Sequence, residues 1–514
     1  MPGTSKTPPR LHSGYNPQAE AARYLAHAVS LAAPECIVVT EPGESHLAGA
    51  IRRKFPGAKI YAIRYQDDFF LDSDPLWDSC WRPASGISPE AFLFRHIPDE
   101  SLPQTVFLPW KPAETFWPQA AERVWQAIAS VIRVQQSVMQ TRAVFGRRWL
   151  KNTVHNLAAA ENIIRCPEIR RAPLLVASGP QLERFPASFY QNLHTRFFLC
   201  GLSSASAFLH ARRVVPDIFL STDGGYWAGR LFQTIPAPVP VLFPPEACIP
   251  DTVLERNPCV FLTYGSECEN TLFPLCGILP ENGERNGTVS GTAVMFFLKH
   301  TAFPVYSIGL DLQPGSGYPH GRPHPFSPET NGRAFRFHPL ESQVVQSKLN
   351  SALDIYRSWF ARLPQALSGR LFRLESSAGE LGQLGGIRSL PVRQPDGSFH
   401  NLPEPRTLPA AAVNPETKTG NGSRHSPLCK AERRKAIRRW LFETAEKTAR
   451  SGRALQAVSA RDNIETEIVK LYGYAEYISL RKSAAEGKNG TAASAEELCA
   501  KAAGFLRELG EQLH

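Results

Sequence analysis

Short apolar runs bounded by turn-forming residues mark two stretches of the chain. In the first, residues 36–41 and 58–65 flank a helical pattern at about 44–55, which predicts a small β-α-β unit. In the second, six apolar runs alternate with helical patterns or loops, at residues 174–177, 197–202, 217–221, 239–243, 259–264 and 305–310. This alternation predicts an α/β fold with a central doubly wound, largely parallel sheet of the Rossmann-like type.

Helical periodicity dominates two further stretches. Residues from about 114 to 161 predict one or two long helices, on which Asn152 and Asn156 share a face because they lie four positions apart. Residues 429–514 carry Ala, Glu, Lys, Arg and Leu at helical spacing, after a stretch rich in Pro, Asn, Thr, Gly and Ser. We therefore predict four regions: a smaller N-terminal α/β domain ending in long helices (1–165), the central Rossmann-like domain (166–395), a linker or long loop (396–428) and a helical C-terminal domain (429–514).

Composition places the chain among globular proteins. Of its 514 residues, 43% are hydrophobic and 20% are charged, which excludes a disordered chain. The ten cysteines form no CxxC pair, so their spacing indicates neither a zinc site nor a disulfide framework. No apolar run approaches the roughly 18 residues of a membrane span, and the first residues lack the apolar core of a secretion signal. We therefore expect a cytoplasmic protein with reduced thiols and no membrane span.

The net charge of +10 is partly local, because six basic residues lie between Lys430 and Arg439. Such a run is either the solvated face of a helix or a surface for an acidic partner. No zinc-finger or RNA-recognition signature accompanies it, so we do not expect a nucleic-acid partner. We predict that the run helps to recruit an acidic protein surface.

Polar and small residues follow several of the predicted strands directly. The carboxyl ends of parallel strands meet at one edge of a sheet, and ligands bind there, near the point where the strand order reverses. The candidates at this edge are Ser178, Gly179, Pro180, Ser203, Asp223, Asp311 and His320. Two simpler interpretations stay open: residues 178–180 form only a tight turn, and Ser203 only caps the next helix.

Two histidines, His320 and His324, lie four positions apart in the sequence HGRPH. Gly321 and Pro323 between them exclude a helix, so the spacing does not bring the two rings onto one face. It therefore indicates no metal site.

The same stretches together resemble a known family. The combination of LLVASGPQLERF (174–185), PDIFLSTDGG (216–225), GTVSGTAVMFFLKHTAFPVYSIGLDL (287–312) and the downstream His320 resembles the motility accessory factor family of flagellin glycosyltransferases. The central domain of that family is shared with archaeal-type 6-hydroxymethyl-7,8-dihydropterin diphosphokinases. Residues 11–25 and 145–157 are similar to the amino-terminal part of the family, so the resemblance covers about residues 11–390.

The resemblance implies a fold and an activity. It implies a sialyltransferase-like central domain that transfers a nonulosonic acid from a CMP-activated donor to Ser or Thr of flagellin in the cytoplasm, in support of flagellum assembly and motility. The family's aspartate falls on Asp223, its Gly-x-Asp element on Gly309 and Asp311, and its loop histidine on His320, which has the intrinsic pKa range of a general base. Asp223, Asp311 and His320 are thus the expected catalytic residues.

The donor carries a phosphate and a carboxylate, which helix-terminal amides can bind. We expect such amides near Gly179 and at a second helix start formed by Ser290, Gly291 and Thr292. The family's Gly-Pro-Ser turn falls on Gly179-Pro180-Gln181, so an amide replaces the serine hydroxyl.

Three questions stay open at this stage. A magnesium ion held by Asp223 and Asp311 is one option, although no cofactor is required by these motifs. A diphosphokinase that uses ATP and magnesium is an alternative activity. The third reading is a non-catalytic flagellar assembly or binding factor, and Gln181 is the residue that points to it.

Overall fold

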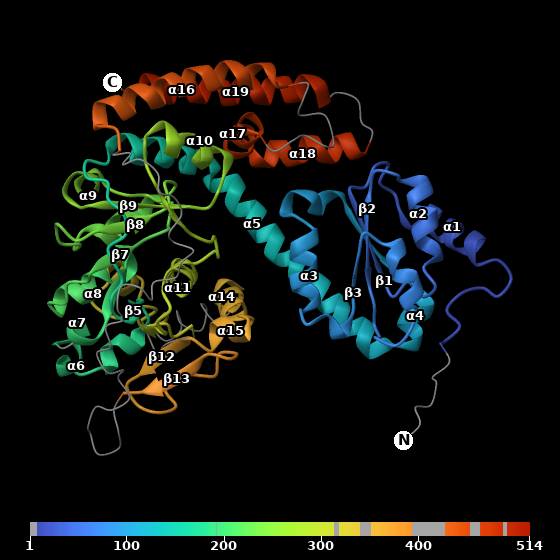
Figure 1. Cartoon of the computed structure of the whole chain (residues 1–514), viewed down its shortest axis with the longest axis horizontal. Helices are drawn as coiled ribbons and strands as arrows, with labels where there is room; N and C mark the ends of the chain where they lie inside the picture. Colours follow the sequence, from blue (N-terminus) through green and yellow to red (C-terminus); the bar gives the residue numbers. More distant parts are fainter. Residues whose placement is uncertain are drawn as a thin grey trace. The chain divides into compact units, whose positions relative to one another are not determined.

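The structure is a computed structural model, and it describes residues 8–191, 193–312, 318–339, 351–392, 427–452, 463–486 and 491–513. The chain forms two compact units: residues 1–146 with 444–506, and residues 147–443 with 507–514. Figure 1 shows the elements of each unit. The predicted boundaries near residues 165, 395 and 428 stay predictions, and almost all of the predicted linker lies outside the described residues.

The first unit contains a parallel four-stranded sheet in the order β3-β2-β1-β4. Its strands are β1 (Cys36–Thr40), β2 (Lys59–Ile63), β3 (Ser79–Trp81) and β4 (Thr105–Pro109). The predicted β-α-β unit is confirmed, with α2 (His46–Lys54) between β1 and β2. The other helices wholly within this unit are α1 (Pro17–Ala28), α3 (Pro89–His96), α4 (Lys111–Phe116), α17 (Ile464–Tyr472) and α18 (Tyr474–Ala485).

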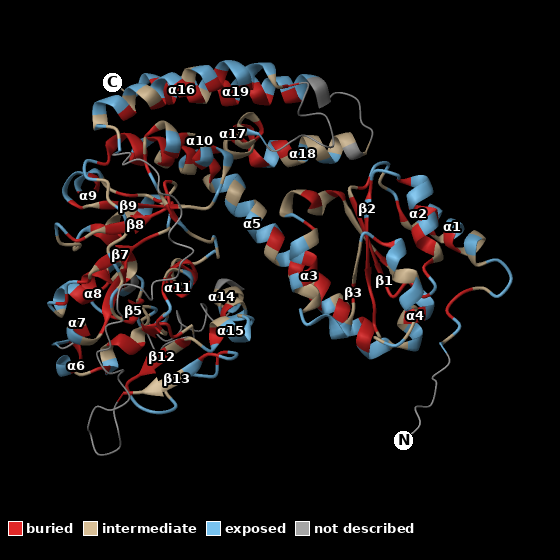
Figure 2. Ribbon diagram, in the orientation of Figure 1, coloured by how far each residue is buried: buried red, intermediate tan, exposed pale blue. Residues whose placement is uncertain are grey.

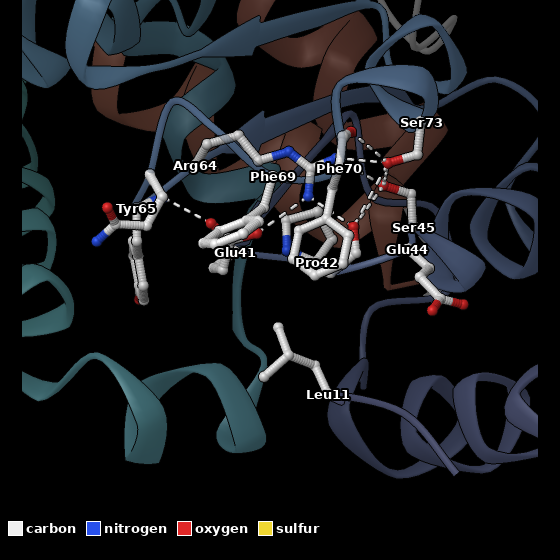
Figure 3. Close-up of polar contacts among 12 residues, drawn as sticks. Leu11, Glu41, Pro42, Glu44, Ser45, Arg64, Tyr65, Phe69, Phe70 and Ser73 are labelled. Atoms are coloured by element: carbon white, nitrogen blue, oxygen red, sulfur yellow. Dashed lines mark hydrogen bonds and ion pairs between the residues drawn. The ribbon is translucent and has the colours of Figure 1, made fainter. Parts of the chain in front are cut away.

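A buried arginine links the loops that follow β1 and β2. The Arg64 side chain is fully buried and forms ion pairs with Glu41 at 3.0 Å and Asp74 at 2.9 Å. It also donates hydrogen bonds to the hydroxyls of Ser45 and Ser73, as Figure 3 shows. The acceptors around Arg64 offset the cost of burying its charge, so this edge of the first sheet is held together by the chain's own polar groups.

The second unit contains a nine-stranded sheet in which every strand pairing is parallel, in the order β10-β9-β8-β7-β6-β5-β11-β12-β13. The strands are β5 (Pro173–Val176), β6 (Phe198–Leu202), β7 (Ile218–Leu220), β8 (Val241–Phe243), β9 (Cys259–Thr263), β10 (Glu281–Asn282), β11 (Val305–Ile308), β12 (Leu371–Glu375) and β13 (Arg388–Pro391). The six predicted strands correspond to β5–β9 and β11, and the predicted α/β fold class is confirmed.

Most successive strands are joined by one or more α-helices, the usual crossover between parallel strands. The helices are α6 (Ala187–Gln191), α7 (Leu193–Arg196), α8 (Ser206–Ala211), α9 (Asp251–Arg256), α10 (Glu267–Leu275), α11 (Val289–His300), α12 (Ser327–Gly332), α14 (Ser351–Ala361) and α15 (Gln365–Ser368). The α11 helix is buried from Gly291 to Leu298, and it joins the apolar core of the sheet. In Figure 2 the buried residues are concentrated on the strands of both sheets.

Three helices contribute residues to both units: α5 (Pro118–Ala159), α16 (Lys430–Arg450) and α19 (Thr491–Glu511). The helical character predicted for the C-terminal region and for the stretch from about 114 to 161 is therefore confirmed. Among the described residues, no helix has the length and hydropathy needed to cross a membrane.

The basic run at the start of α16 corrects one prediction. Arg433 is only 2% exposed, and its guanidinium donates hydrogen bonds to the carbonyl oxygens of Leu157, at 2.8 Å, and Ala160. These carbonyls belong to the end of α5, where the last turn of a helix leaves acceptors unpaired. The prediction that the whole run recruits a partner is wrong for Arg433, because this side chain caps α5.

Candidate active site

The strand order of the second sheet reverses between β5 and β11. Successive strands from β5 to β10 extend toward one edge of the sheet, and β11, β12 and β13 extend toward the other. In a doubly wound sheet, ligands bind at the carboxyl ends of the two strands that flank such a reversal. Ser178, Gly179 and Pro180 follow β5, and Gly309 and Asp311 follow β11, so the structure places these five predicted residues at the reversal.

Backbone contacts hold the two turns against each other. The amide of Gly179 donates to the carbonyl oxygen of Gly309 at 2.8 Å. A side chain on Gly179 would place its Cβ 2.5 Å from both that oxygen and the Cγ of Asp311. Gly309 has a φ of +69°, and its own Cβ would lie 2.5 Å from the carbonyl oxygen of Ala177. Both positions therefore require glycine.

The carboxylate of Asp311 holds the turn after β5 through a hydrogen bond. Its Oδ2 accepts a hydrogen bond from the backbone amide of Gln181 at 2.8 Å. The residue is 8% exposed, and its buried Oδ1 has no hydrogen-bond partner among the residues that the structure describes. Burial raises the pKa of Asp311 to about 6, against the opposing effects of the Gln181 amide and of Arg184. The carboxyl group therefore titrates close to neutral pH while it holds the turn.

His320 reaches the same turn from a loop far along the chain. Its Nδ1 lies 3.1 Å from the hydroxyl oxygen of Ser178, and the amide of Gly321 donates to the carbonyl oxygen of Ser178 at 2.8 Å. The imidazole stacks on that of His324, with ring centroids 4.2 Å apart. Burial lowers the pKa of His320, which keeps the ring neutral and able to accept a proton.

Gln181 lies directly after the turn formed by Ser178, Gly179 and Pro180. Its side-chain amide donates to Glu380, in the loop after β12, at 3.2 Å, and Gln181 itself is only 4% exposed. The Gln181 side chain thus connects the turn after β5 with the loop after β12.

Two other predicted residues lie further along the same edge of the sheet. Ser203, after β6, is 1% exposed and donates to the hydroxyl of Ser221, after β7, at 3.0 Å. Asp223 is exposed, and its carboxylate accepts a hydrogen bond from the amide of Gly225 at 2.8 Å. The structure brings Ser178, Asp311 and the His320 loop into direct contact with the turn at Gly179, and it places Ser203 and Asp223 one and two strands away.

The start of α11 supplies its own cap. Thr288 accepts a hydrogen bond from the amide of Gly291 at 2.7 Å, and its hydroxyl lies 3.3 Å from that of Ser290. The hydroxyl of Thr292 donates to the carbonyl oxygen of Glu284 at 3.0 Å. An anion at this helix start would therefore have to compete with the Thr288 cap for the Gly291 amide.

The sequence analysis missed the role of one face of α5. Asn152 donates to the carbonyl oxygen of Glu246 at 2.8 Å, and Asn156 to that of Ala247 at 2.7 Å. A Cβ on Gly224 would lie 2.5 Å from the Trp149 ring, so this ring packs directly on the turn after β7. Residues three, four and seven apart share a helix face, and the shared face of the two asparagines was the available signal for a docking helix.

The magnesium prediction stays open. Within the described part of the chain, no three or more His, Cys, Asp or Glu side chains form a group that could hold a metal ion. The donor set at Asp311 also differs from a metal site, because one of its oxygens accepts a backbone amide. A role for Asp223 and Asp311 as metal ligands is therefore only a prediction.

Comparison with known proteins identifies one relative. The chain is 34% identical over 397 residues to an uncharacterized protein from Treponema pallidum (strain Nichols), which covers 77% of this chain and 84% of that protein. It belongs to the same family as this treponemal protein. No family model matches the chain.

Among solved structures, the chain is similar to a MAf glycosyltransferase from Magnetospirillum magneticum AMB-1. The sequence identity is 12%, the TM-score is 0.47, and the alignment covers 98% of this chain and 84% of that one.

Proposed function

We propose that the protein is a glycosyltransferase that transfers a nonulosonic acid from a CMP-activated donor to Ser or Thr hydroxyls of flagellin. The sequence motifs that resemble motility accessory factors suggest this reaction. The observation that carries the proposal is their position: the turn at Gly179, the Gly309–Asp311 element and the His320 loop are remote in sequence and meet where the strand order reverses. We place the reaction in the cytoplasm, in support of flagellum assembly.

The residues at the reversal fit the parts of such a reaction. The amides of Gly179 and Gln181 already donate to Gly309 and Asp311, so the expectation that amides of this turn bind the donor does not hold for these two. We expect the hydroxyl of Ser178 to contact the donor phosphate instead. His320 removes the proton from the acceptor hydroxyl while the oxygen attacks the anomeric carbon. The bond between that carbon and the phosphate oxygen breaks, and CMP leaves with the electron pair. Asp311 keeps the turn in place through the Gln181 amide, and we expect the exposed Asp223 to face the acceptor.

Ligand binding tests this proposal against its alternatives. We would measure the unfolding temperature of the full chain with CMP, with CMP-N-acetylneuraminic acid and with ATP plus magnesium. A ligand at about 100 times its dissociation constant stabilises the folded protein by about 2.7 kcal/mol. Stabilisation by CMP and its sugar conjugate is the expected result.

The same measurement separates the other two functions. Stabilisation by ATP and magnesium alone would favour a pterin diphosphokinase activity. Stabilisation by none of the three ligands would favour a non-catalytic flagellar factor. A Gly179→Ala variant provides the site control, because its added methyl group meets the Gly309 carbonyl and should abolish the effect of CMP.

A further inference from the structure

Ser178 lies in the turn that we expect to contact the donor, and its hydroxyl contacts His320, the proposed general base. Ser178 lies at the start of the turn after β5, whereas His320 lies 142 residues further along the chain. The hydroxyl oxygen is 3.1 Å from Nδ1 of the ring. The backbone reinforces this contact, because the amide of Gly321 donates to the carbonyl oxygen of Ser178 at 2.8 Å. Ser178 as a whole is half-buried.

A neutral imidazole carries its proton on one of two nitrogens, and the partner of the other nitrogen decides which. A serine hydroxyl can donate to Nδ1, which leaves the proton on Nε2, or accept from Nδ1, which leaves Nε2 free to act as a base. In the protein without a donor, both arrangements are available to the Ser178–His320 pair.

The neighbouring ring of His324 does not determine which nitrogen of His320 carries the proton. His324 accepts a hydrogen bond at Nδ1 from the backbone amide of Phe326 at 3.3 Å, so its proton lies on Nε2. Burial, together with the proximity of His320 and Arg230, lowers the pKa of His324 to about 3. It is therefore a neutral ring in a fixed tautomer, stacked on His320, and it exchanges no proton near neutral pH.

We propose that donor binding sets the tautomer of His320 through Ser178. The inference rests on the proposed function. When a phosphate or carboxylate oxygen of the donor accepts a hydrogen bond from the Ser178 hydroxyl, the hydroxyl oxygen becomes the acceptor for the N–H at Nδ1 of His320. Nε2 then carries the lone pair and can accept the proton of the acceptor hydroxyl. Ser178 is thus a positioning residue that makes the base competent only when the donor is bound.

The chain contains internal references for a direct test. The Nδ1 of His300 lies 2.8 Å from the carbonyl oxygen of Phe296, and because a carbonyl only accepts, His300 carries its proton on Nδ1. His324 carries it on Nε2 for the reason given above. Nitrogen-15 NMR of the histidine side chains distinguishes protonated from unprotonated ring nitrogens, so these two rings mark the two tautomers. A His320→Asn variant identifies the signals of His320 by their loss.

The experiment adds CMP to the full-length protein and to its Ser178→Ala and Ser178→Thr variants. We expect CMP to move His320 toward the Nδ1-protonated tautomer in the natural protein and in Ser178→Thr, which keeps the hydroxyl. In Ser178→Ala we expect no shift of the tautomer. We also expect kcat to fall by at least about tenfold and the KM of the donor to rise, because the hydrogen bond from Ser178 to the donor is lost. Unchanged signals of His300 and His324 would show that the variant is folded.

The outcomes separate this inference from the proposed function. If CMP stabilises the protein but leaves the His320 tautomer unchanged, or shifts it equally in Ser178→Ala, the coupling through Ser178 is refuted and the proposed function stands. If CMP neither stabilises the protein nor changes any histidine signal, the proposed donor site is wrong, and the inference fails with it.

Discussion

Replacing Asp311 by asparagine should remove a loss of stability that the second unit undergoes as the pH rises. In the natural protein Asp311 is 8% exposed and its carboxylate accepts a hydrogen bond from the amide of Gln181. Its Oδ1 has no hydrogen-bond partner in the described part of the chain. Such a group is easier to bury as an acid than as an anion. Asparagine keeps an oxygen for the Gln181 amide and carries no charge at any pH.

The size and sign of the effect follow from the pKa. Burial raises the pKa of Asp311 from 3.8 to about 6, and each pKa unit corresponds to about 1.4 kcal/mol, so the ionised form costs about 3 kcal/mol. Because the folded pKa is the higher one, this cost is absent below pH 3.8, grows between pH 3.8 and about 6 and is complete above that. The natural protein should therefore lose about 3 kcal/mol relative to Asp311→Asn as the pH rises from about 4 to about 7.

Scanning calorimetry of both proteins between these pH values measures the difference. For a domain of the size of the second unit, about 3 kcal/mol corresponds to roughly 4 °C in the unfolding temperature. Asp78→Asn provides a control of opposite sign: although burial raises the pKa of Asp78, the Ile60 amide and Arg52 lower it overall, so its stabilising effect is lost as the pH falls. Parallel pH curves for the natural protein and Asp311→Asn would refute the burial argument.

Two further substitutions test the architecture around the site. Gly179→Ala, whose Cβ would lie 2.5 Å from the Gly309 carbonyl oxygen, should lower the free energy of unfolding by about 1–3 kcal/mol. In the same denaturant titrations Gly57→Ala should have little effect, because its Cβ meets no described atom within 4 Å. Equal stabilities of the two variants would contradict the close approach at Gly179. Arg433→Met leaves the carbonyls at the end of α5 unpaired and should cost about 2–4 kcal/mol, whereas Arg438→Met on the exposed face should change stability by less than about 0.5 kcal/mol. A similar loss in both arginine variants would show that Arg433 is not the cap.

The sequence predicted those strands whose own residues form an apolar run. Apolar runs predicted β5–β9 and β11, and parallel pairing placed the residues after them at one edge without knowledge of any contact. The β12 strand was missed because Arg373 and Glu375 interrupt its apolar pattern. Nη2 of this buried arginine donates to the hydroxyl of Ser389, on the neighbouring strand β13, at 3.0 Å. Local periodicity contains no information on such a partner.

The side-chain contacts of the site were not predictable for the same reason. His320 and Ser178 are in contact although they lie 142 residues apart, and their spacing gives no indication of it. The burial of Arg433 depends on backbone carbonyls, which every residue carries. The pattern of the helix predicted a basic face but could not show which of its arginines points inward.

The central claim is sugar transfer at the carboxyl edge of the second sheet, and one measurement tests it directly. The purified chain and its His320→Asn variant are each incubated with a CMP-activated nonulosonic acid and flagellin, and the mass of intact flagellin is recorded over time. The natural protein should add the mass of the sugar at Ser or Thr, and the variant should be at least about a hundredfold slower while CMP still raises its unfolding temperature. Equal transfer by both proteins, or no transfer by the natural protein despite CMP binding, would contradict the account.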